Sequence, residues 1–161
     1  MIKFYVSVCN CIESIKKIGL SRPELKIKLL NKDARIPYRA EPGSAGYDVF
    51  CTKPIEIYPG TRQLVATGIS TEFSKSYYLR VAPRSGLSVK GIDIGAGVID
   101  SSYRGEIKVL VINNSEIILT FPKGTKIAQL IMESCEEPEI IVSNFLSVSN
   151  RNDNGFGSTG N

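Results

Sequence analysis

The chain has 161 residues, 20 basic and 16 acidic side chains, a net charge of +4 and 42% hydrophobic residues, values typical of one ordinary globular domain. Its basic residues are scattered, so no nucleic-acid groove is indicated, and no apolar run is long enough for a membrane-spanning helix. There is no histidine, which excludes Ser-His-Asp and Cys-His catalysis. Any general base must therefore be a carboxylate, lysine, tyrosine or thiolate.

The four cysteines form neither a CxxC pair nor a zinc-ligand spacing. They are Cys9, Cys11, Cys51 and Cys135. Reduced, packed thiols are the usual state of such residues inside a cell, and the N-terminus reads poorly as a secretory signal. We therefore expect an intracellular protein, cytoplasmic or nuclear.

Residues 1–24 form an N-terminal extension with a pattern of their own. Ile12, Ile15 and Ile18 recur at every third position, which predicts a short amphipathic helix from about Cys11 to Ile18, ended by Gly19. Two alternatives stay open for this segment. It is either an added element packed on the core, or a disordered segment that could be left untranslated in the cell.

Short runs of β-branched and aromatic residues then follow one another along the chain. The runs are Leu25–Leu29, Tyr77–Ala82, Ile107–Ile112, Ile117–Phe121, Ile127–Met132 and Ile140–Phe145. Asn113 and Asn114 predict a hairpin tip, because asparagine tolerates positive φ. One helical turn is predicted after Pro83, with Ser85 as N-cap and residues 86–90 following. Many short strands with little helix indicate an all-β sandwich, jelly roll or barrel.

Two polar residues stand out against apolar surroundings. Asp100 follows Gly95–Ile99, which is predicted to be an apolar strand with permissive glycines. A carboxylate fixed at the end of a strand but open to a cleft could polarise a water molecule; the alternative is an aspartate that only starts a turn. Gln129 lies within an apolar strand, so its amide must find partners or face a site.

The C-terminal residues carry the groups needed to grip a nucleotide. Phe156 offers a face on which a base can stack, and glycines let backbone N–H groups converge on phosphate oxygens. Arg151, Ser158 and Thr159 add donors. Such a tail cannot order itself alone, so it would act only once something else positions it.

Five segments together resemble, in order and spacing, the motifs of trimeric dUTPases (dUTP diphosphatases). They are Ser44–Asp48, Pro83–Ser88, Gly95–Glu106, Gly124–Ile131 and Arg151–Gly160. The resemblance implies an all-β, jelly-roll-like distorted β-barrel subunit with one short helix. It also implies assembly as a homotrimer with shared active sites, in which one chain supplies the phosphate motifs, a second the uracil hairpin and a third the tail. It places the β domain at residues 25–146 and a flexible C-terminal lid at 147–161.

The resemblance also implies the activity. A dUTPase hydrolyses dUTP to dUMP and pyrophosphate by attack of water on the α-phosphorus, which keeps uracil out of DNA and supplies dUMP for thymidylate synthesis. The motif wording is similar to that of eukaryotic and large-virus enzymes, so a viral protein would act in the host cell. The substrate is a small molecule; neither nucleic acid nor membrane is an expected partner.

Site residues follow from the motifs, with Asp100 as the base that activates water. In the family Tyr103 packs beneath the deoxyribose and excludes a ribose 2′-hydroxyl. By resemblance, Gly97 and the main chain of Val98, Ile99 and Lys108 line the slot that binds uracil. The phosphate and lid residues implied are Arg84, Ser85, Gly86, Gln129, Arg151, Phe156, Gly157, Ser158 and Thr159. Glu106 and Lys108 stand where many relatives carry asparagine and glycine.

The expected cofactor is Mg²⁺. Gly46, Tyr47 and Asp48 are predicted to form a turn, which could be purely structural. In the family the aspartate at the position of Asp48 helps to hold the ion through its waters, while phosphate oxygens coordinate it directly, which suits a metal that dehydrates reluctantly.

Two rivals remain from the sequence. A dCTP deaminase shares the fold, although the tail with Phe156 and the spacing of Asp100 and Tyr103 favour a dUTPase. The second rival is a regulatory binding protein that has kept the fold but works through contacts with a partner. The motifs leave room for such an extra role in residues 1–24.

Overall fold

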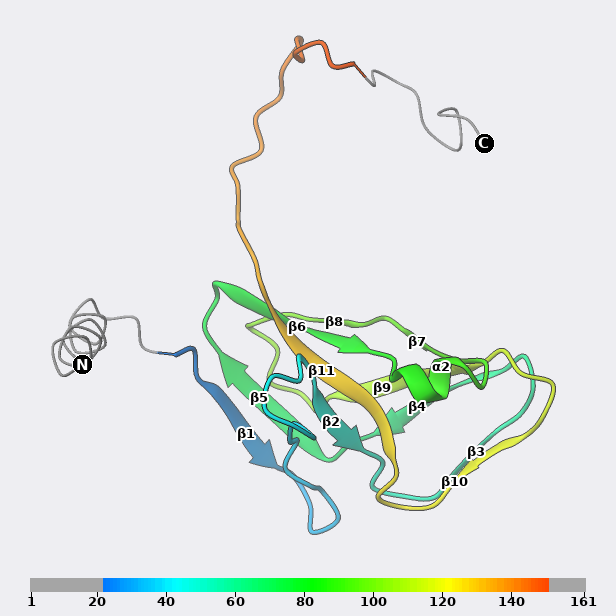
Figure 1. Cartoon of the computed structure of the whole chain (residues 1–161). Coiled ribbons are helices and arrows are strands. Elements are labelled where there is room, and N and C mark those ends of the chain that lie inside the picture. Colours follow the sequence, from blue (N-terminus) through cyan, green and yellow to red (C-terminus); the bar gives the residue numbers. More distant parts are fainter. Residues whose placement is uncertain (1–21, 151–161) are drawn as a thin grey trace, which may run out of the picture.

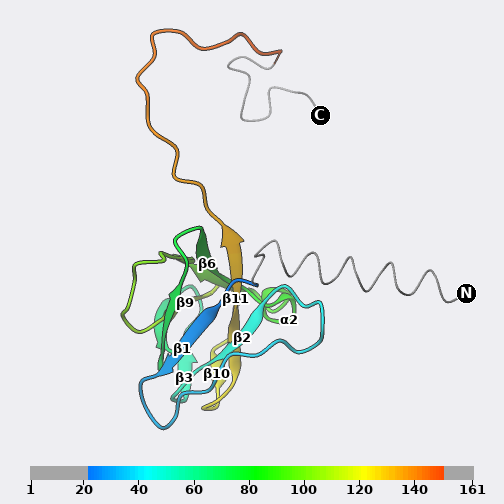
Figure 2. The same cartoon turned by 90° about the vertical axis from the view of Figure 1, so that its left-hand side faces the viewer.

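The computed structural model describes residues 22–150, which form eleven β-strands and one short helix (Figures 1 and 2). The strands are β1 (Leu25–Leu29), β2 (Tyr47–Phe50), β3 (Ile55–Ile57), β4 (Arg62–Ala66), β5 (Ile69–Phe73), β6 (Tyr77–Ala82), β7 (Ile92–Gly95), β8 (Val98–Ile99), β9 (Lys108–Asn113), β10 (Leu119–Phe121) and β11 (Lys126–Ser134). The helix α2 is a single turn, Ser85–Ser88. The prediction of an all-β domain with one short helix is confirmed.

The strands pair into four small sheets rather than one closed barrel within this part of the chain. Their orders are β1-β5, β10-β3, β2-β11-β6-β8 and β4-β9-β7, and every pairing is antiparallel. Apolar side chains from all of them meet in one core, in which Leu79, Val109 and Leu130 are fully buried. The core thus joins sheets that share no strand.

Strand β11 is the long central member of the four-stranded sheet. Its first half pairs with β2 and its second half with β6, and it then leaves the body of the molecule (Figures 1 and 2). A register shift lies between Lys126 and Ala128 on the β2 side. Such an irregularity breaks the strict alternation of side chains between the two faces of a strand.

The chain changes sheets between β7 and β8. β7 pairs with β9, whereas β8 pairs with β6. Ala96, which lies between the two strands, has φ of 49°, in the left-handed region that non-glycine residues rarely adopt. The run from Gly95 to Ile99 was predicted as one continuous strand; this is wrong, because the backbone turns at Ala96.

Three further predictions are corrected. Asn113 is no hairpin tip: β9 and β10 pair with different strands, and the buried Asn113 amide instead donates to the carbonyls of Ile57 and Ile117 at 2.9 and 2.8 Å. Arg84, not Ser85, occupies the N-cap position of α2, without a side-chain capping bond. Tyr47 and Asp48, read as a turn, lie in β2.

The segment 135–150 contains no strand, although Ile140–Phe145 was predicted to be one. Its apolar side chains are exposed, with Ile140, Val142 and Phe145 each at least 89% accessible. A strand needs a neighbouring backbone to pair with, and this segment extends away from the body (Figure 2). The sequence pattern predicted a strand here, but residues 22–150 of the single chain supply no neighbouring strand with which this segment could pair.

Within residues 22–150, Cys51 is buried and Cys135 exposed, and both thiols are free. The same range contains no helix long and apolar enough to cross a membrane. The predicted helix between Cys11 and Ile18 lies outside the described residues.

Candidate active site

The centre of β11 brings three of the five sequence motifs together. Gln129 is paired in register with Asp48 of β2 on one side and with Ala82 of β6 on the other. Because Arg84 follows two residues after Ala82, the pairing of β6 with β11 carries it to the same place. A cavity of about 410 Å³ lies here. Its walls include Ser44, Gly46, Asp48, Arg84, Ser85, Gly86 and Gln129.

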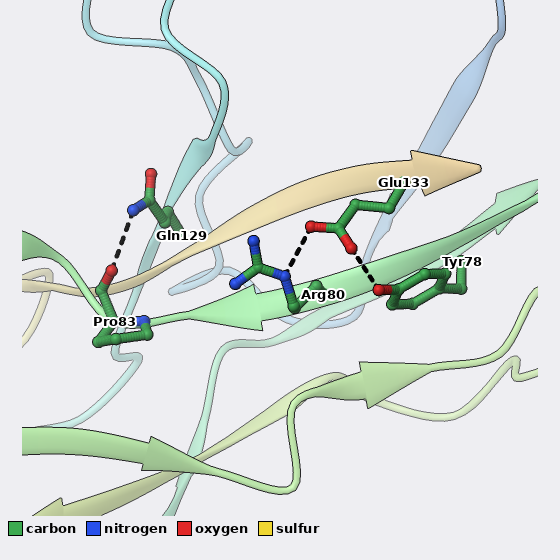
Figure 3. Close-up of polar contacts among 5 residues, drawn as sticks. All are labelled: Tyr78, Arg80, Pro83, Gln129 and Glu133. Atoms are coloured by element: carbon green, nitrogen blue, oxygen red, sulfur yellow. Dashed lines mark hydrogen bonds and ion pairs between the residues drawn. The ribbon is translucent and has the colours of Figure 1, made fainter. Parts of the chain in front are cut away.

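The side-chain amide of Gln129, a polar group in an apolar strand, has a hydrogen-bond partner and also faces the cavity. Its Nε2 donates to the carbonyl of Pro83 at 3.0 Å, as Figure 3 shows. At Gly46 an added Cβ would lie 2.1 Å from the Gln129 Oε1, so only glycine leaves room for this amide. Gln129 therefore both fixes the loop that carries Arg84 and lines the cavity.

Figure 3 shows a second contact between β6 and β11. Arg80 Nε lies 2.6 Å from Glu133 Oε1, and the Tyr78 hydroxyl donates to the other carboxylate oxygen. The hydrogen bond from Tyr78, and then that from Arg80, holds the pKa of Glu133 below its ordinary value. The pairing that presents Gln129 is thus reinforced by charge.

Asp48 is the carboxylate of the cavity, and it is only 7% exposed. Arg84 Nε lies 2.9 Å from its Oδ1 and Lys126 Nζ lies 2.8 Å from its Oδ2. Lys126 also lies 4.7 Å from the centre of the Tyr38 ring. Contact with Asp48, and then with Tyr38, raises the pKa of Lys126. One carboxylate therefore holds two cations in place.

Arg84 is well placed for an anionic ligand. Besides its contact with Asp48, its Nη1 donates to the carbonyl of Lys126 at 3.4 Å. A guanidinium carries five N–H donors, and these two contacts leave donors for phosphate oxygens. Ser85 begins α2, and the first N–H groups of a helical turn have no acceptor within the turn itself.

A second cavity of about 350 Å³ lies elsewhere on the chain. It is lined by Leu64, Val98, Ile99, Asp100, Tyr103, Glu106 and Lys108. Val98 and Ile99 form β8, which lies at the edge of its sheet and pairs with β6. The predicted base, the predicted sugar-excluding ring and three predicted uracil-reading positions therefore share one cavity.

Asp100 follows β8 directly and is exposed. Its backbone carbonyl accepts the Tyr103 N–H at 3.1 Å, forming the turn that the alternative interpretation of Asp100 required. Its side chain nevertheless lines the cavity. The structure therefore allows both interpretations at once. Tyr103, 43% exposed, donates its hydroxyl to the carbonyl of Glu106 at 3.0 Å.

Gly97 contributes through its backbone. Its carbonyl accepts the N–H of Val81 at 2.7 Å, which ties the start of β8 to β6. An added Cβ would lie 2.6 Å from the Val81 carbonyl oxygen. Gly97 does not line the cavity itself, but it sets where Val98 begins.

The two cavities have no lining residue in common. We call them the phosphate cavity, around Asp48 and Arg84, and the hairpin cavity, around Asp100 and Tyr103. The predicted tail residues lie outside the described range. They are Arg151, Phe156, Gly157, Ser158 and Thr159.

Of the described side chains, Asp48 is the one carboxylate that lines the phosphate cavity. Across residues 22–150 no group of three or more His, Cys, Asp and Glu side chains could hold an ion. Asp48 supplies the oxygen ligand that Mg²⁺ prefers, but both of its oxygens are ion-paired. The residues would fit only a Mg²⁺ ion that is coordinated directly by the oxygens of an anionic ligand and contacts Asp48 through water.

Among the residues at the site that were not predicted from the sequence, Lys126 pairs with Asp48 without lining the phosphate cavity, and Leu64 lines the hairpin cavity. Strict alternation along β11 places Lys126 and Gln129 on opposite faces of the strand, so Lys126 was not predicted at the site. The register shift between Lys126 and Ala128, which breaks this alternation, leaves no signal in the sequence. A basic residue inside the fourth motif was the only available signal. Leu64 was missed because β4 shows no signal for the hairpin cavity that it lines.

Comparison with protein families matches the dUTPase model to residues 32–160. The deoxyuridine 5′-triphosphate nucleotidohydrolase of vaccinia virus (strain Copenhagen) is 47% identical over 143 residues, which are 89% of this chain and 97% of the viral one. The protein of the same description from variola virus is 46% identical over the same shares.

Solved structures agree. A dUTPase of Staphylococcus bacteriophage 80alpha with dUPNHPP has a TM-score of 0.80 at 30% identity, covering 85% of this chain and 98% of that chain. A mutant dUTPase from phage phi11 of S. aureus, described as revealing the coordination of a structural Mg(II) ion, has a TM-score of 0.71 at 25% identity, with 76% and 97% covered. The chain therefore belongs to the dUTPase family, enzymes that hydrolyse dUTP to dUMP and pyrophosphate.

Proposed function

We propose that this chain hydrolyses dUTP with Asp100 as general base. Asp100 accepts a proton from a water molecule, whose oxygen forms a bond to the α-phosphorus. The bond from that phosphorus to the bridging oxygen breaks, and pyrophosphate leaves while dUMP remains. The observation that carries this proposal is the hairpin cavity, where Asp100 and Tyr103 meet the main chain of Val98 and Ile99.

Base and sugar are selected in the same cavity. Backbone groups of Val98, Ile99 and Lys108, set in place by Gly97, would pair with the edge of uracil, and cytosine would present the wrong donor at position 4. The Tyr103 ring would collide with a ribose 2′-hydroxyl. A steric collision is needed, because an apolar pocket alone rejects an added hydroxyl only weakly.

The triphosphate would occupy the phosphate cavity. Arg84 contributes charged donors, and Ser85, Gly86 and Gln129 contribute hydroxyl, backbone and amide groups. Mg²⁺ would enter with the triphosphate, with Asp48 reaching it through water. When bound, the ion neutralises phosphate charge.

We propose further that the working enzyme is a homotrimer with shared sites. Two separate cavities in one chain, each lined by a different set of motif residues, are what a site built between copies requires. The exposed apolar side chains of segment 135–150 also need a surface to cover them. The tail from Arg151, with the ring of Phe156, would close over a neighbour's site and exclude water.

A pyrophosphate-release assay tests the activity. We expect turnover of dUTP and little of dCTP, dTTP or UTP, with no ammonia from dCTP. Replacing Asp100 by asparagine keeps shape but removes the proton acceptor. We expect at least an approximately 100-fold loss of turnover, with nucleotide binding within a few-fold. Near-normal turnover of this variant would remove Asp100 from the role, and ammonia release would favour the deaminase.

Mixing two inactive variants tests the sharing. Chains that lack residues 151–161 keep the base, whereas Asp100→Asn chains keep the tail. If tail and base come from different copies, subunit exchange creates some sites with both, and activity rises above that of either parent. Verified mixed trimers without recovered activity would contradict the shared lid.

A further inference from the structure

The segment that carries Asp100 and Tyr103 is irregular, yet it is bonded at several points. Residues 100–107 contain no strand or helix. The Arg104 side chain donates back to the carbonyls of Ser101 and Tyr103 at 2.6 and 3.0 Å. These bonds close the turn on itself, but they do not attach it to the domain.

Attachment comes from the turn between β4 and β5, residues 67–68, and from the first two residues of β5. The Ser70 hydroxyl donates to the Arg104 carbonyl at 2.7 Å, and the Ile107 N–H donates to the Ile69 carbonyl at 2.8 Å. Thr67 donates its hydroxyl to the Ile107 carbonyl. In each of these bonds the segment supplies a backbone group.

Glu106 contributes a side chain of the segment to this attachment. Its Oε1 accepts the N–H of Gly68 at 2.8 Å. Gly68 has φ of 70°, and an added Cβ there would lie within 2.9 Å of Ala34, Asn31 and Thr52. The turn is therefore tightly enclosed, and a backbone N–H that loses its acceptor in such a place is costly.

The same residue meets the ring of Tyr103. The Tyr103 hydroxyl donates to the backbone carbonyl of Glu106. At Gly105 a Cβ would lie 2.4 Å from that hydroxyl oxygen, so the ring packs closely over the glycine. The hydroxyl end of the Tyr103 ring is thus hydrogen-bonded to Glu106, the residue whose carboxylate accepts the Gly68 N–H.

We propose that Glu106 is a positioning residue for sugar discrimination: its bond to the Gly68 amide holds the Tyr103 ring at a fixed depth in the hairpin cavity. This rests on the proposed role of Tyr103 in excluding ribose. Glu106 touches no reacting atom in this proposal; it acts through Tyr103. Any acceptor of similar length can serve, because the bond needs an oxygen and no particular charge.

The experiment compares Glu106→Ala with Glu106→Gln. Both variants lose the charge, but only glutamine keeps an oxygen that can accept the Gly68 N–H. Glu116→Ala, an exposed position on the loop between β9 and β10, is the control for a lost surface carboxylate. Two readouts are taken: the ratio of kcat/KM for UTP to that for dUTP, and hydrogen exchange of the Gly68 amide.

We expect Glu106→Ala to raise the UTP/dUTP ratio severalfold and to speed Gly68 exchange by about 10- to 100-fold, as loss of a hydrogen bond to a charged group predicts. Glu106→Gln should stay within about threefold of the parent ratio, and Glu116→Ala should match the parent.

Three results would overturn the proposal. The first is an unchanged ratio in Glu106→Ala despite faster Gly68 exchange, which would make Glu106 structural only. The second is identical behaviour of the alanine and glutamine variants, which would remove the acceptor argument. The third is a parent protein that does not hydrolyse dUTP, in which case the proposed function fails while Gly68 exchange still reports the bond. If alanine prevents folding, Glu106→Gln is compared with Glu106→Met, which has similar length but no oxygen.

Discussion

Replacing Gly97 by alanine tests whether the hairpin cavity depends on close approach of β8 to β6. The new Cβ would lie 2.6 Å from the carbonyl oxygen of Val81. Carbon and oxygen rarely approach closer than about 3.3 Å, so the backbone must move apart. That movement strains the bond in which the Val81 N–H donates to the Gly97 carbonyl at 2.7 Å.

The cost can be worked from these two contacts. Forcing an extra methyl group into a packed place costs about 1–3 kcal/mol, and a weakened hydrogen bond adds about 0.5–1.5 kcal/mol. We expect the free energy of unfolding to fall by about 1.5–4.5 kcal/mol. Because Val98 and Ile99 follow directly, the same shift should lower kcat/KM for dUTP.

Urea denaturation with a matched glycine variant provides the measurement. At Gly86 an added Cβ meets nothing within 4 Å, so Gly86→Ala is the stability control. If Gly97→Ala unfolds at the same urea concentration as Gly86→Ala, the close approach does not hold β8 in place and the reasoning is refuted.

Two further changes test the strand pairing around the cavities. Ala96→Gly should raise the free energy of unfolding by about 0.5–1 kcal/mol, because relief of left-handed strain outweighs the added freedom of the unfolded chain; a loss of stability in urea would contradict this. Since the folded pKa of Glu133 is lowered, its contribution is present above the unfolded pKa and is lost as pH falls through the folded one. Glu133→Gln should therefore flatten the fall of Tm below about pH 5, and an unchanged slope would remove the ion pair from acid stability.

Much of the fold was readable because local patterns dominate its strands. Strands β1 and β6 match the predicted bounds, since alternating apolar residues face one core. The errors lie where the structure of a segment depends on which other strand it pairs with. Nothing near Asn113 in the sequence says that β10 will pair with β3 instead of β9. The pattern at Ile140–Phe145 meets the local requirement for a strand, but pairing needs a backbone that the single chain does not bring to it.

In the candidate site, too, local motifs were predicted correctly, whereas features that depend on contacts between distant segments were not. Motif spacing identified Asp48, Arg84, Gln129, Asp100 and Tyr103, and each lines one of the two cavities. The separation between the cavities was not readable from one chain's residues alone, nor was the ion-pairing of Asp48. The contact between Lys126 and Asp48 depends on a register shift within β11, and a shift of this kind leaves no mark on apolar alternation.

The pairing of Asp48 with Arg84 and Lys126 has a consequence for substrate capture. Two cations around one carboxylate leave the phosphate cavity with one positive charge in excess before any nucleotide arrives. Such a charge attracts a polyanion over a distance that salt shortens to about 8 Å at physiological ionic strength. Added salt should therefore slow the encounter with dUTP more than the later chemical step. Pyrophosphate, itself a polyanion, is attracted by the same charge, so the feature that speeds capture also delays product release.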